Sequence, residues 1–538
     1  LTGGFGKTNS TSSTYASFTF RKAEKFFDVQ TYTGNSTAGR TVAHNLGVAP
    51  SMIIIKQTTG TRRWYVWHES FALDDYLFLN QTSAKNVGGT FAYLTADPTS
   101  TTITIARDGS VNYAGYNYVM YLFASDAGGF GDDGDENIIK CGSVTTDGSG
   151  DATVTLGFEP QWVMLKRTDG AGTWAILDTM RGYDHSSSKR LMPNVSDAEE
   201  NYTGTNILGV PTATGFTTSG PVLDANSDYI YIAIRRPMKT PESGTEVFAM
   251  DTLGSTGDGN QPGYRSPFPV DMGLKTSLTG NQRQISTRLL QGTELLTEST
   301  AAEAASASKQ FDYMNGTDTS TATSSVNMMW MLKRATGFMD AVAYSGTGTN
   351  PTNFSHNLNV VPELMIFKKR SASDRWEIYS AALGNSKRID LNTNGAATTN
   401  TSIWGGTPTA TQFSLTDNPN VNQTGQTYIS YLFATLAGVS KVGSYTGTGA
   451  DLNVDCGFSA GARFILIKRT DATGDWYVWD SVRGITAGND PYLLLNTTAA
   501  QVTNTDYIDP LSSGFTVTSS APAALNASGG TYIFLAIA

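Results

Sequence analysis

The sequence predicts an all-β protein, arranged as a tandem array of five β-sandwich domains (jelly-roll or concanavalin-like) of about 100 residues each. An apolar run that ends in lysine and is followed eight residues later by tryptophan occurs four times along the 538 residues. The composition suits strands and tight turns, with 24 Tyr, 24 Phe and 55 Gly but only 16% charged residues. Helical periodicity is almost absent.

The repeated run is typical of a β-hairpin. Residues 464–468 predict one strand, and residues 476–479 predict a second after a polar turn. The strand-end lysines are Lys56, Lys166, Lys368 and Lys468, and the tryptophans are Trp64, Trp174, Trp376 and Trp476. A degraded fifth copy covers residues 270–275, with Arg283 at the tryptophan position. Self-similarity at a period of about 100 residues indicates whole domains rather than a short solenoid repeat.

The repeats define the predicted domain boundaries. The first and fourth are offset by 312 residues and the second and fifth by 302, whereas the third is the most divergent. This order indicates duplication of a three-domain block, and the short linkers predict a stiff rod or curved stack. The predicted segments are the closing strand of a truncated upstream domain (1–25), a first sandwich type (26–127), a second (128–240), a divergent third (241–335), the first type again (336–438) and the second type again (439–538). We refer to the five full segments as the first to fifth repeats.

The start of the chain aligns with a later part of it. Residues 21–34, RKAEKFFDVQTYTG, align without a gap to residues 333–346, KRATGFMDAVAYSG, at the same offset of 312. Residues 16–20 then align with the last strand of the third repeat. We therefore expect the chain to be the C-terminal part of a longer polypeptide.

One predicted strand lacks the alternation of apolar and polar residues. Residues 532–537, YIFLAI, are apolar throughout, which indicates a strand covered on both faces. The cover could come from within the repeat, from a neighbouring repeat or from another subunit, and the sequence leaves these alternatives open.

Charge and cysteine content exclude several classes of protein. The net charge of −10 without a basic stripe argues against nucleic-acid binding. No apolar run reaches the length of a membrane span, and no signal peptide is visible, so membrane insertion is not expected. Cys141 and Cys456 occupy unmatched positions, and both are interpreted as incidental core or strand residues.

The repeated side chains have a structural and a functional interpretation. The four tryptophans could be platforms for sugar stacking, but regular recurrence at one strand position favours core packing. Asparagines that follow or end a Leu-rich strand are interpreted as turn formers rather than ligand contacts. These asparagines are Asn80, Asn194, Asn392 and Asn496.

No catalytic or metal-binding motif emerges. His44 and His356 are equivalent, His68 and His185 stand alone, and no zinc spacing occurs. The acidic run from Asp132 to Glu136 resembles part of a calcium loop but lacks the EF-hand spacing, so a solvated linker is favoured. Phosphate-loop and nucleophile-elbow motifs are missing, and no carboxylate pair is singled out. We predict no catalytic, cofactor-binding or metal residues and no cofactor.

Several strings resemble a known family. RKAEKFFDVQTYTG, HNLGVAP followed by SMIIIK, YLFATLAGVSKVGSYTGTG and FILIKRTDATGDWYVWDSVRG resemble the tandem repeats of tail-fibre-like virion proteins of tailed bacteriophages, especially phages of aquatic hosts. NASGGTYIFLAIA is similar to the way such chains end. The resemblance spans essentially the whole chain and implies a structural, receptor-binding role in the virion without catalytic residues. The third repeat departs most, since it lacks the tryptophan.

The expected function is therefore that of a non-enzymatic virion protein. It would be a homo-oligomeric, fibre-like spacer that binds other tail or capsid proteins and attaches to a host cell-surface glycan or protein. Assembly in the host cytoplasm and release by lysis would reconcile the lack of disulfides with an extracellular β-protein. Two alternatives are a virion-borne polysaccharide depolymerase and a bacterial surface adhesin.

Overall fold

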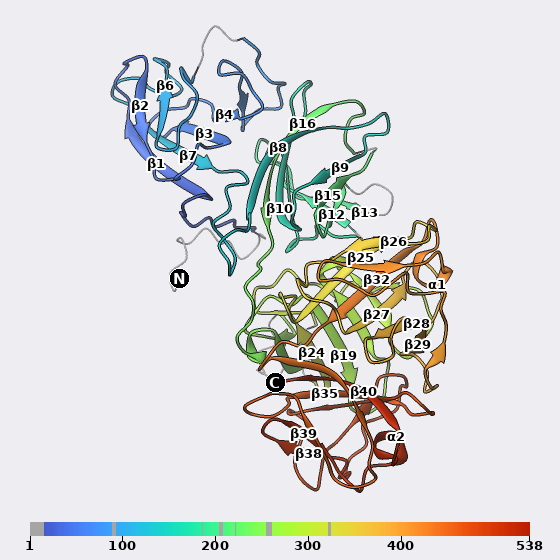
Figure 1. The fold of residues 1–538 in the computed structure, drawn as a ribbon. Helices are drawn as coiled ribbons and strands as arrows, with labels where there is room; N and C mark the ends of the chain where they lie inside the picture. The colour runs from blue at the N-terminus through green and yellow to red at the C-terminus, as the bar shows by residue number, and fades with distance from the viewer. Residues whose placement is uncertain are drawn as a thin grey trace. The chain divides into compact units, whose positions relative to one another are not determined.

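The computed structural model describes residues 15–88, 93–185, 187–203, 208–220, 222–253, 261–320 and 324–538. These residues form many small antiparallel sheets, and the only α-helices among them are the four-residue α1 (Pro419–Asn422) and α2 (Ala523–Asn526) (Figure 1). The predicted all-β class is confirmed. The chain divides into two compact units. The first holds the described residues up to Gly129 with Asn137–Ser143 and Thr168–Gly172, and the second holds Phe130–Glu136, Val144–Arg167 and Thr173–Ala538.

The first unit contains the large sheet of the first repeat. Its strand order is β1-β7-β3-β4-β5, and β2 pairs with β6 in a separate two-stranded sheet. The bounds are β1 Phe27–Thr33, β2 Arg40–Ala43, β3 Met52–Gln57, β4 Tyr65–His68, β5 Leu77–Phe78, β6 Thr102–Ile105 and β7 Asn117–Phe123.

The same strand order recurs in the fourth and fifth repeats. The fourth has the order β25-β32-β27-β28-β29-β30 with the pair β26-β31, and the fifth has β33-β40-β35-β36-β37 with β34-β39-β38. The bounds in the fourth repeat are β25 Met339–Ser345, β26 Thr352–Ser355, β27 Leu364–Lys369, β28 Trp376–Ser380, β29 Lys387–Asp390, β30 Thr398–Thr399, β31 Gln412–Leu415 and β32 Thr427–Phe433. Those in the fifth are β33 Ser440–Thr446, β34 Leu452–Asp455, β35 Phe464–Arg469, β36 Trp476–Asp480, β37 Leu493–Leu494, β38 Ile508–Leu511, β39 Gly514–Val517 and β40 Thr531–Ile537.

The divergent third repeat keeps this order in spite of its different sequence. Its sheet runs β17-β24-β19-β20-β21-β22, with the pair β18-β23. Its bounds are η2 Gly244–Glu246, β17 Phe248–Leu253, β18 Tyr264–Arg265, β19 Met272–Ser277, β20 Gln284–Thr287, η3 Arg288–Leu290, β21 Thr293–Leu296, β22 Ala304–Ala305, β23 Gly316–Thr317 and β24 Ser324–Leu332.

In the second repeat β10 lies between β11 and β16, as β27 lies between β28 and β32 in the fourth. Two smaller sheets are formed by β12-β13 and by β14-β15-β9. The bounds are β8 Ile139–Thr145, β9 Ala152–Thr155, β10 Pro160–Arg167, β11 Ala175–Asp178, β12 Ser187–Arg190, β13 Glu200–Thr203, β14 Gly209–Thr212, β15 Gly215–Thr218 and β16 Asp228–Arg235.

The large sheets of the third, fourth and fifth repeats are buried on both faces. In β40, Tyr532, Phe534 and Ala536 pack into a core that belongs to the fifth repeat alone. The alternate residues Ile533, Leu535 and Ile537 lie in a second core. Successive strand residues point to opposite faces, so a strand covered on both sides must be apolar throughout.

This second core is shared between the repeats. It joins Trp330 of the third repeat, Trp376 of the fourth and Trp476 of the fifth with some thirty other buried apolar residues. Three sheets therefore pack around one common centre within the second unit. The predicted rod or curved stack is wrong for these three repeats, because their apolar sheet faces turn toward each other.

The beginning and the end of this three-sheet group meet. A Cβ atom added to Gly244 would come within 1.9 Å of the carbonyl oxygen of Ala538. The amide of Ala538 also donates to the carbonyl of Val439 at 2.9 Å. The chain thus enters the group at the third repeat and reaches its last residue at nearly the same place.

Candidate functional site

Two of the four predicted tryptophans, Trp376 and Trp476, lie in the core shared by the sheets of the third, fourth and fifth repeats. Trp174, Trp376 and Trp476 are each at most 1% exposed, whereas Trp64 is half-buried. Each begins or directly precedes the second strand of its hairpin, and its main-chain amide donates to an asparagine side chain. These bonds are Trp64 to Asn80, Trp174 to Asn194, Trp376 to Asn392 and Trp476 to Asn496, at 2.9 to 3.1 Å. The repeated asparagines therefore hold the tryptophan strand in place, a role that their position in a turn did not reveal.

The indoles of two of these tryptophans bind the preceding repeat. Trp376 Nε1 donates to the carbonyl of Leu296 in the third repeat, and Trp476 Nε1 donates to the carbonyl of Asp390 in the fourth, both at 2.9 Å. Leu296 and Asp390 occupy equivalent positions at the ends of β21 and β29. The core tryptophan is thus also the hydrogen-bond donor of an interface between repeats.

Arg283, at the tryptophan position of the third repeat, contacts the fifth repeat, so that the third, fourth and fifth repeats form a closed ring of contacts. Its Nε donates to the carbonyl of Leu494, at the end of β37 in the fifth repeat, at 3.1 Å, and its Nη2 donates to Ala499. Burial lowers the pKa of Arg283 to about 10, although Glu298 acts in the opposite direction. The third repeat thus contacts the fifth as the fourth contacts the third and the fifth contacts the fourth.

The repeated lysines serve the same interfaces. Lys368 and Lys468 pair in register with Trp376 and Trp476 across their hairpins. Lys468 Nζ donates to the carbonyls of Asn394 and Gly395 in the fourth repeat, at 3.0 and 2.8 Å, and Lys368 Nζ donates to Thr300 in the third at 3.3 Å. Burial lowers the pKa of both lysines to about 8.

Main-chain hydrogen bonds repeat around the ring as well. An amide in the segment that follows β21, β29 or β37 donates to the carbonyl of the residue directly after β27, β35 or β19, respectively. The three equivalent bonds are Glu303 to Arg370 at 2.9 Å, Ala397 to Thr470 at 2.8 Å and Gln501 to Leu278 at 2.9 Å. The three interfaces therefore share one main-chain arrangement. We call it the lysine–tryptophan interface after the two contacts, third with fourth and fourth with fifth, in which both side chains take part.

Outside these interfaces the other two strand-end lysines bond locally. Lys56, which is half-buried, donates to the carbonyl of Arg62 at 2.5 Å, and Lys166, which is buried, donates to the carbonyl of Arg167 at 2.7 Å. Lys275 of the degraded copy lies 3.6 Å from Asp318.

A buried cluster of charges joins the second, third and fourth repeats. Arg334 donates to the Glu159 carboxylate through Nη1 and Nη2, at 3.0 and 2.8 Å. Arg236 forms ion pairs with Glu159 at 3.1 Å and with Asp340 at 3.0 Å. All four side chains are at most 11% exposed. Burial disfavours the charged form of Arg334, but Glu159, Asp271 and Asp340 together raise its pKa.

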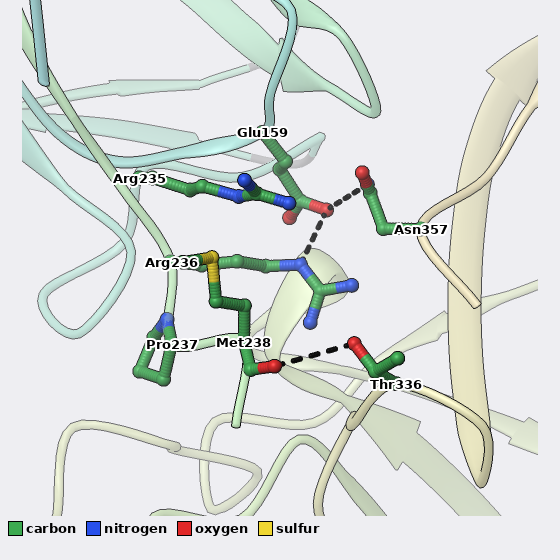
Figure 2. Close-up of a pocket in the computed structure, with 7 residues that line it drawn as sticks. All are labelled: Glu159, Arg235, Arg236, Pro237, Met238, Thr336 and Asn357. Carbon is green, nitrogen blue, oxygen red and sulfur yellow. Dashed lines mark hydrogen bonds and ion pairs between the residues drawn. The ribbon is translucent and has the colours of Figure 1, made fainter. Parts of the chain in front are cut away.

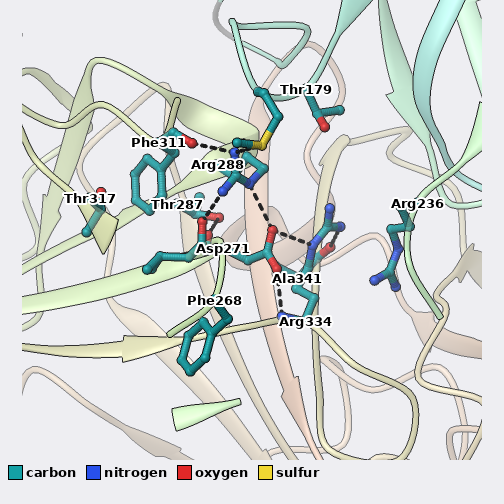
Figure 3. Close-up of polar contacts among 12 residues, drawn as sticks. Thr179, Arg236, Phe268, Asp271, Thr287, Arg288, Phe311, Thr317, Arg334 and Ala341 are labelled. Carbon is teal, nitrogen blue, oxygen red and sulfur yellow. Dashed lines mark hydrogen bonds and ion pairs between the residues drawn. The ribbon is translucent and has the colours of Figure 1, made fainter. Parts of the chain in front are cut away.

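Asp271 extends this cluster further within the third repeat (Figure 3). Its carboxylate accepts from Arg288 Nε at 3.1 Å and from the main-chain amide of Arg334 at 2.8 Å. Burial alone would raise the pKa of Asp271, but Arg334 and Arg288 lower it. Buried charges that are paired and hydrogen-bonded in this way fix one geometry, because moving either partner leaves the other charge buried and unpaired.

The cluster lines the pocket shown in Figure 2. There Glu159 lies between Arg236 and Asn357, whose Nδ2 donates to it at 3.4 Å, and Thr336 donates to the carbonyl of Met238 at 3.3 Å. The free space is about 10 Å³, which fits about one water molecule. Its one carboxylate, that of Glu159, is already bound to the guanidinium groups of Arg236 and Arg334, so the pocket suits joining repeats rather than holding a substrate.

The cysteines, His185 and the acidic run noted in the sequence have the following contacts in the structure. Cys141 and Cys456 are buried free thiols, and burial raises the pKa of both, that of Cys456 to about 12. His185 is half-buried with Nε2 3.0 Å from the carbonyl of Pro211, and desolvation lowers its pKa to about 3. Glu136, at the end of the acidic run from Asp132, forms an ion pair of 2.7 Å with Arg235.

Two searches of the described residues gave negative results. No group of three or more His, Cys, Asp or Glu side chains among them is arranged to hold a metal ion. Nor does the described part of the chain contain a helix long and apolar enough to cross a membrane.

The geometry defines a class of protein in which repeated β-sheets are interlocked by a recurring interface. Within this class, the chain belongs to the family described as a domain of unknown function, DUF7483, which matches residues 2–236 and 286–538. The two matched stretches end at residues separated by 302, the offset between the second and fifth repeats. No curated protein matches the chain.

Proposed function

We propose that the chain is a structural protein of a phage virion, acting as a fibre-like spacer that also contributes to host attachment. In this proposal five β-sandwich domains, with the boundaries predicted from the repeats, form the spacer. Other tail or capsid proteins and further copies of the chain are its partners in the particle.

The observation that carries the proposal is the recurrence of the lysine–tryptophan interface. The side chains copied most faithfully along the sequence, such as Trp376 and Lys468, bind neighbouring repeats instead of surrounding a cavity. Repetition of an interface produces a rigid assembly, which is what a spacer requires. Repetition of a catalytic site would have no comparable benefit.

The buried charge cluster supports the same role. Glu159, Arg334 and Asp340 come from three different repeats, are almost fully buried and are joined by ion pairs of Arg334 with both carboxylates. Such a junction resists bending because each movement would separate buried opposite charges. A spacer with fixed junctions keeps its two ends at a more constant distance than one with flexible linkers does.

Attachment is assigned to exposed loops, with the fifth repeat as the distal end. Val482 and Val502 are 54% and 39% exposed in loops of this repeat. A host glycan or protein bound weakly at many copies would give strong attachment through multivalency. Assembly in the host cytoplasm before release by lysis agrees with the buried free thiols, Cys141 and Cys456.

Electron microscopy of virions labelled with an antibody to this chain tests the proposal. We expect label on the tail or the capsid, and unlabelled particles would contradict a virion role. Incubation of the purified chain with host polysaccharide tests the alternative enzymatic role. We expect the polysaccharide to keep its length, and shortened chains would favour a depolymerase.

A further inference from the structure

The third repeat has polar side chains where the fourth and fifth repeats have apolar ones. Lys275 of β19 pairs with Gln284 of β20. By strand register, Lys275 takes the position of Phe367 in the fourth repeat and of Ile467 in the fifth, which lie in the cores of those repeats. The core that the third repeat forms by itself also comprises fewer of the described residues than those two cores do. The third repeat therefore has less apolar burial of its own to stabilise it.

Lys309 lies at the centre of this polar cluster and is only 2% exposed. Its Nζ donates to the side-chain carbonyl oxygen of Gln284 at 3.1 Å and to the carboxylate of Asp318 at 3.3 Å. Lys275 lies 3.6 Å from the same carboxylate, so two amines share Asp318. Burial lowers the pKa of Lys309 and the ammonium of Lys275 lowers it further, whereas Asp318 and Glu294 raise it. Because the pKa stays below its usual value, more of this amine is uncharged than in water.

Glu294 of β21 binds the nitrogen end of the same carboxamide. Gln284 Nε2 donates to Glu294 Oε1 at 3.1 Å. The second carboxylate oxygen, Oε2, is buried, has no hydrogen-bond partner among the described residues and lies 3.9 Å from Lys309 Nζ. A buried acceptor without a donor is unusual in a network that serves only to hold a fold together. This carboxylate lies close to both the amine and the amide nitrogen, so it can accept a proton from one and give it to the other.

We propose that Lys309 and Gln284 form an intramolecular amide cross-link, with Glu294 as the group that transfers the proton. Glu294 first accepts a proton from the Lys309 ammonium, and the freed lone pair of Nζ forms a bond to Gln284 Cδ. Glu294 then gives this proton to Nε2, and the Cδ–Nε2 bond breaks. The second proton lost by Nζ leaves with the ammonia as an ammonium ion. The products are one secondary amide and one ammonium ion, and no oxidant or cofactor takes part.

The arrangement of the reacting groups suits this step. Cδ of Gln284 is bonded directly to Oε1, so the amine that donates to this oxygen already lies next to the carbon that it attacks. Water is the competing nucleophile, and it has little access to an amine that is 2% exposed.

The cross-link would compensate for the small core of the third repeat. It joins residues that are 25 positions apart in the sequence, one on β20 and one in the segment between β22 and β23. A covalent bond of this kind restricts the unfolded chain as a disulfide does, and small domains commonly need such a constraint. Unlike a disulfide, it forms without an oxidising compartment. The proposal does not depend on the virion role of the chain.

The mass of the intact, unmodified chain gives the first test. We expect it to lie about 17 Da below the mass calculated from the sequence, because one ammonia is lost. Trypsin does not cleave after an acylated lysine, so it should release residues 284–288 covalently joined to residues 289–333. A chain of full mass, or one that has lost ammonia without yielding this branched peptide, would overturn the proposal. A loss of about 18 Da, which indicates condensation with a carboxylate and release of water, would overturn it too.

Variants test the assigned roles. Lys309→Met and Gln284→Met should both keep their full calculated mass, whereas Gln282→Met, at an exposed neighbouring glutamine, should still lose ammonia. Glu294→Gln should slow the loss of ammonia at least tenfold, when the mass is followed after cell-free synthesis. An unchanged rate in this variant would overturn the role of Glu294. If a variant does not fold, the branched peptide of the unmodified chain decides.

Discussion

The indole nitrogen of Trp476 lies 2.9 Å from the carbonyl oxygen of Asp390, a residue of the preceding repeat. Through this bond the Trp476 side chain of the fifth repeat is also part of the fourth repeat's surface of contact. Equivalent bonds at Trp376 and Arg283 extend the relationship to three sheets. The stability of one repeat therefore depends on the presence of its neighbours.

Replacing Trp476 with alanine should destabilise the second unit by about 3–5 kcal/mol, because it removes a fully buried indole from the shared core. The equivalent Trp64→Ala is the matched control. It should cost about half as much, since Trp64 is only half-buried. Denaturant unfolding, followed by the hydrogen exchange of each unit, measures both. Equal losses of unfolding free energy would contradict the difference in burial between Trp476 and Trp64.

Replacing Arg283 with methionine should open the contact between the third and fifth repeats. The carbonyls of Leu494, which is half-buried, and of Ala499, which is exposed, would lose their donors, at about 1 kcal/mol for each hydrogen bond. Hydrogen exchange should rise at residues 493–501 and remain unchanged at the equivalent residues 389–397. Arg283→Trp should recover part of the loss, because one indole N–H can serve Leu494. Uniform exchange throughout the second unit would argue against a separate closing contact.

The buried charge cluster should tolerate the loss of one partner poorly. Arg334→Met leaves Glu159 and Asp340 with fewer countercharges in a buried site, which should cost about 3–5 kcal/mol. Lys22 is the counterpart of Arg334 in the first repeat, and its ammonium lies 2.9 Å from Asp28 with a side chain that is 52% exposed. Lys22→Met should therefore cost less than about 1 kcal/mol. A similar cost at both positions in thermal or urea unfolding would be inconsistent with this comparison.

Stability should rise with pH between about 7.5 and 9.5. Burial lowers the pKa of Lys368 and Lys468 from 10.5 to about 8 in the folded state, so the unfolded chain binds more protons in this range. Each lysine should contribute about 1 kcal/mol per pH unit near pH 9, below the limit of about 1.4 kcal/mol for one full proton. Urea midpoints across this range should have a smaller slope in the Lys368→Met/Lys468→Met double variant. An unchanged slope would show that these amines do not titrate as buried groups.

Local structure was predictable from the sequence because it depends on local spacing. The interval of eight between Lys368 and Trp376 predicts two strands and a turn, and the two residues are register partners across β27 and β28. The uniform apolar character of residues 532–537 indicates two covered faces. The structure assigns Phe534 to the core of its own repeat and Ile533 to the shared core.

The partners across repeats were not predictable from the same patterns. A sequence repeat shows that Trp476 is needed, but the carbonyl of Asp390 carries no sequence signal because every residue has one. Arg283 looked like the loss of a tryptophan, whereas it donates to the same position of the edge strand through a guanidinium. Glu159 and Arg334 are 175 residues apart and belong to no periodic motif. Only the three-dimensional arrangement brings them together.

The close approach of Gly244 to Ala538 has a mechanical consequence. Tension applied to the polypeptide at these two positions enters and leaves the three-sheet group at almost the same point. The roughly 290 residues between them carry no tension until the contact between Gly244 and Ala538 is broken. Force applied at Gly244 and Ala538 would therefore follow a short path while the residues between them stay folded.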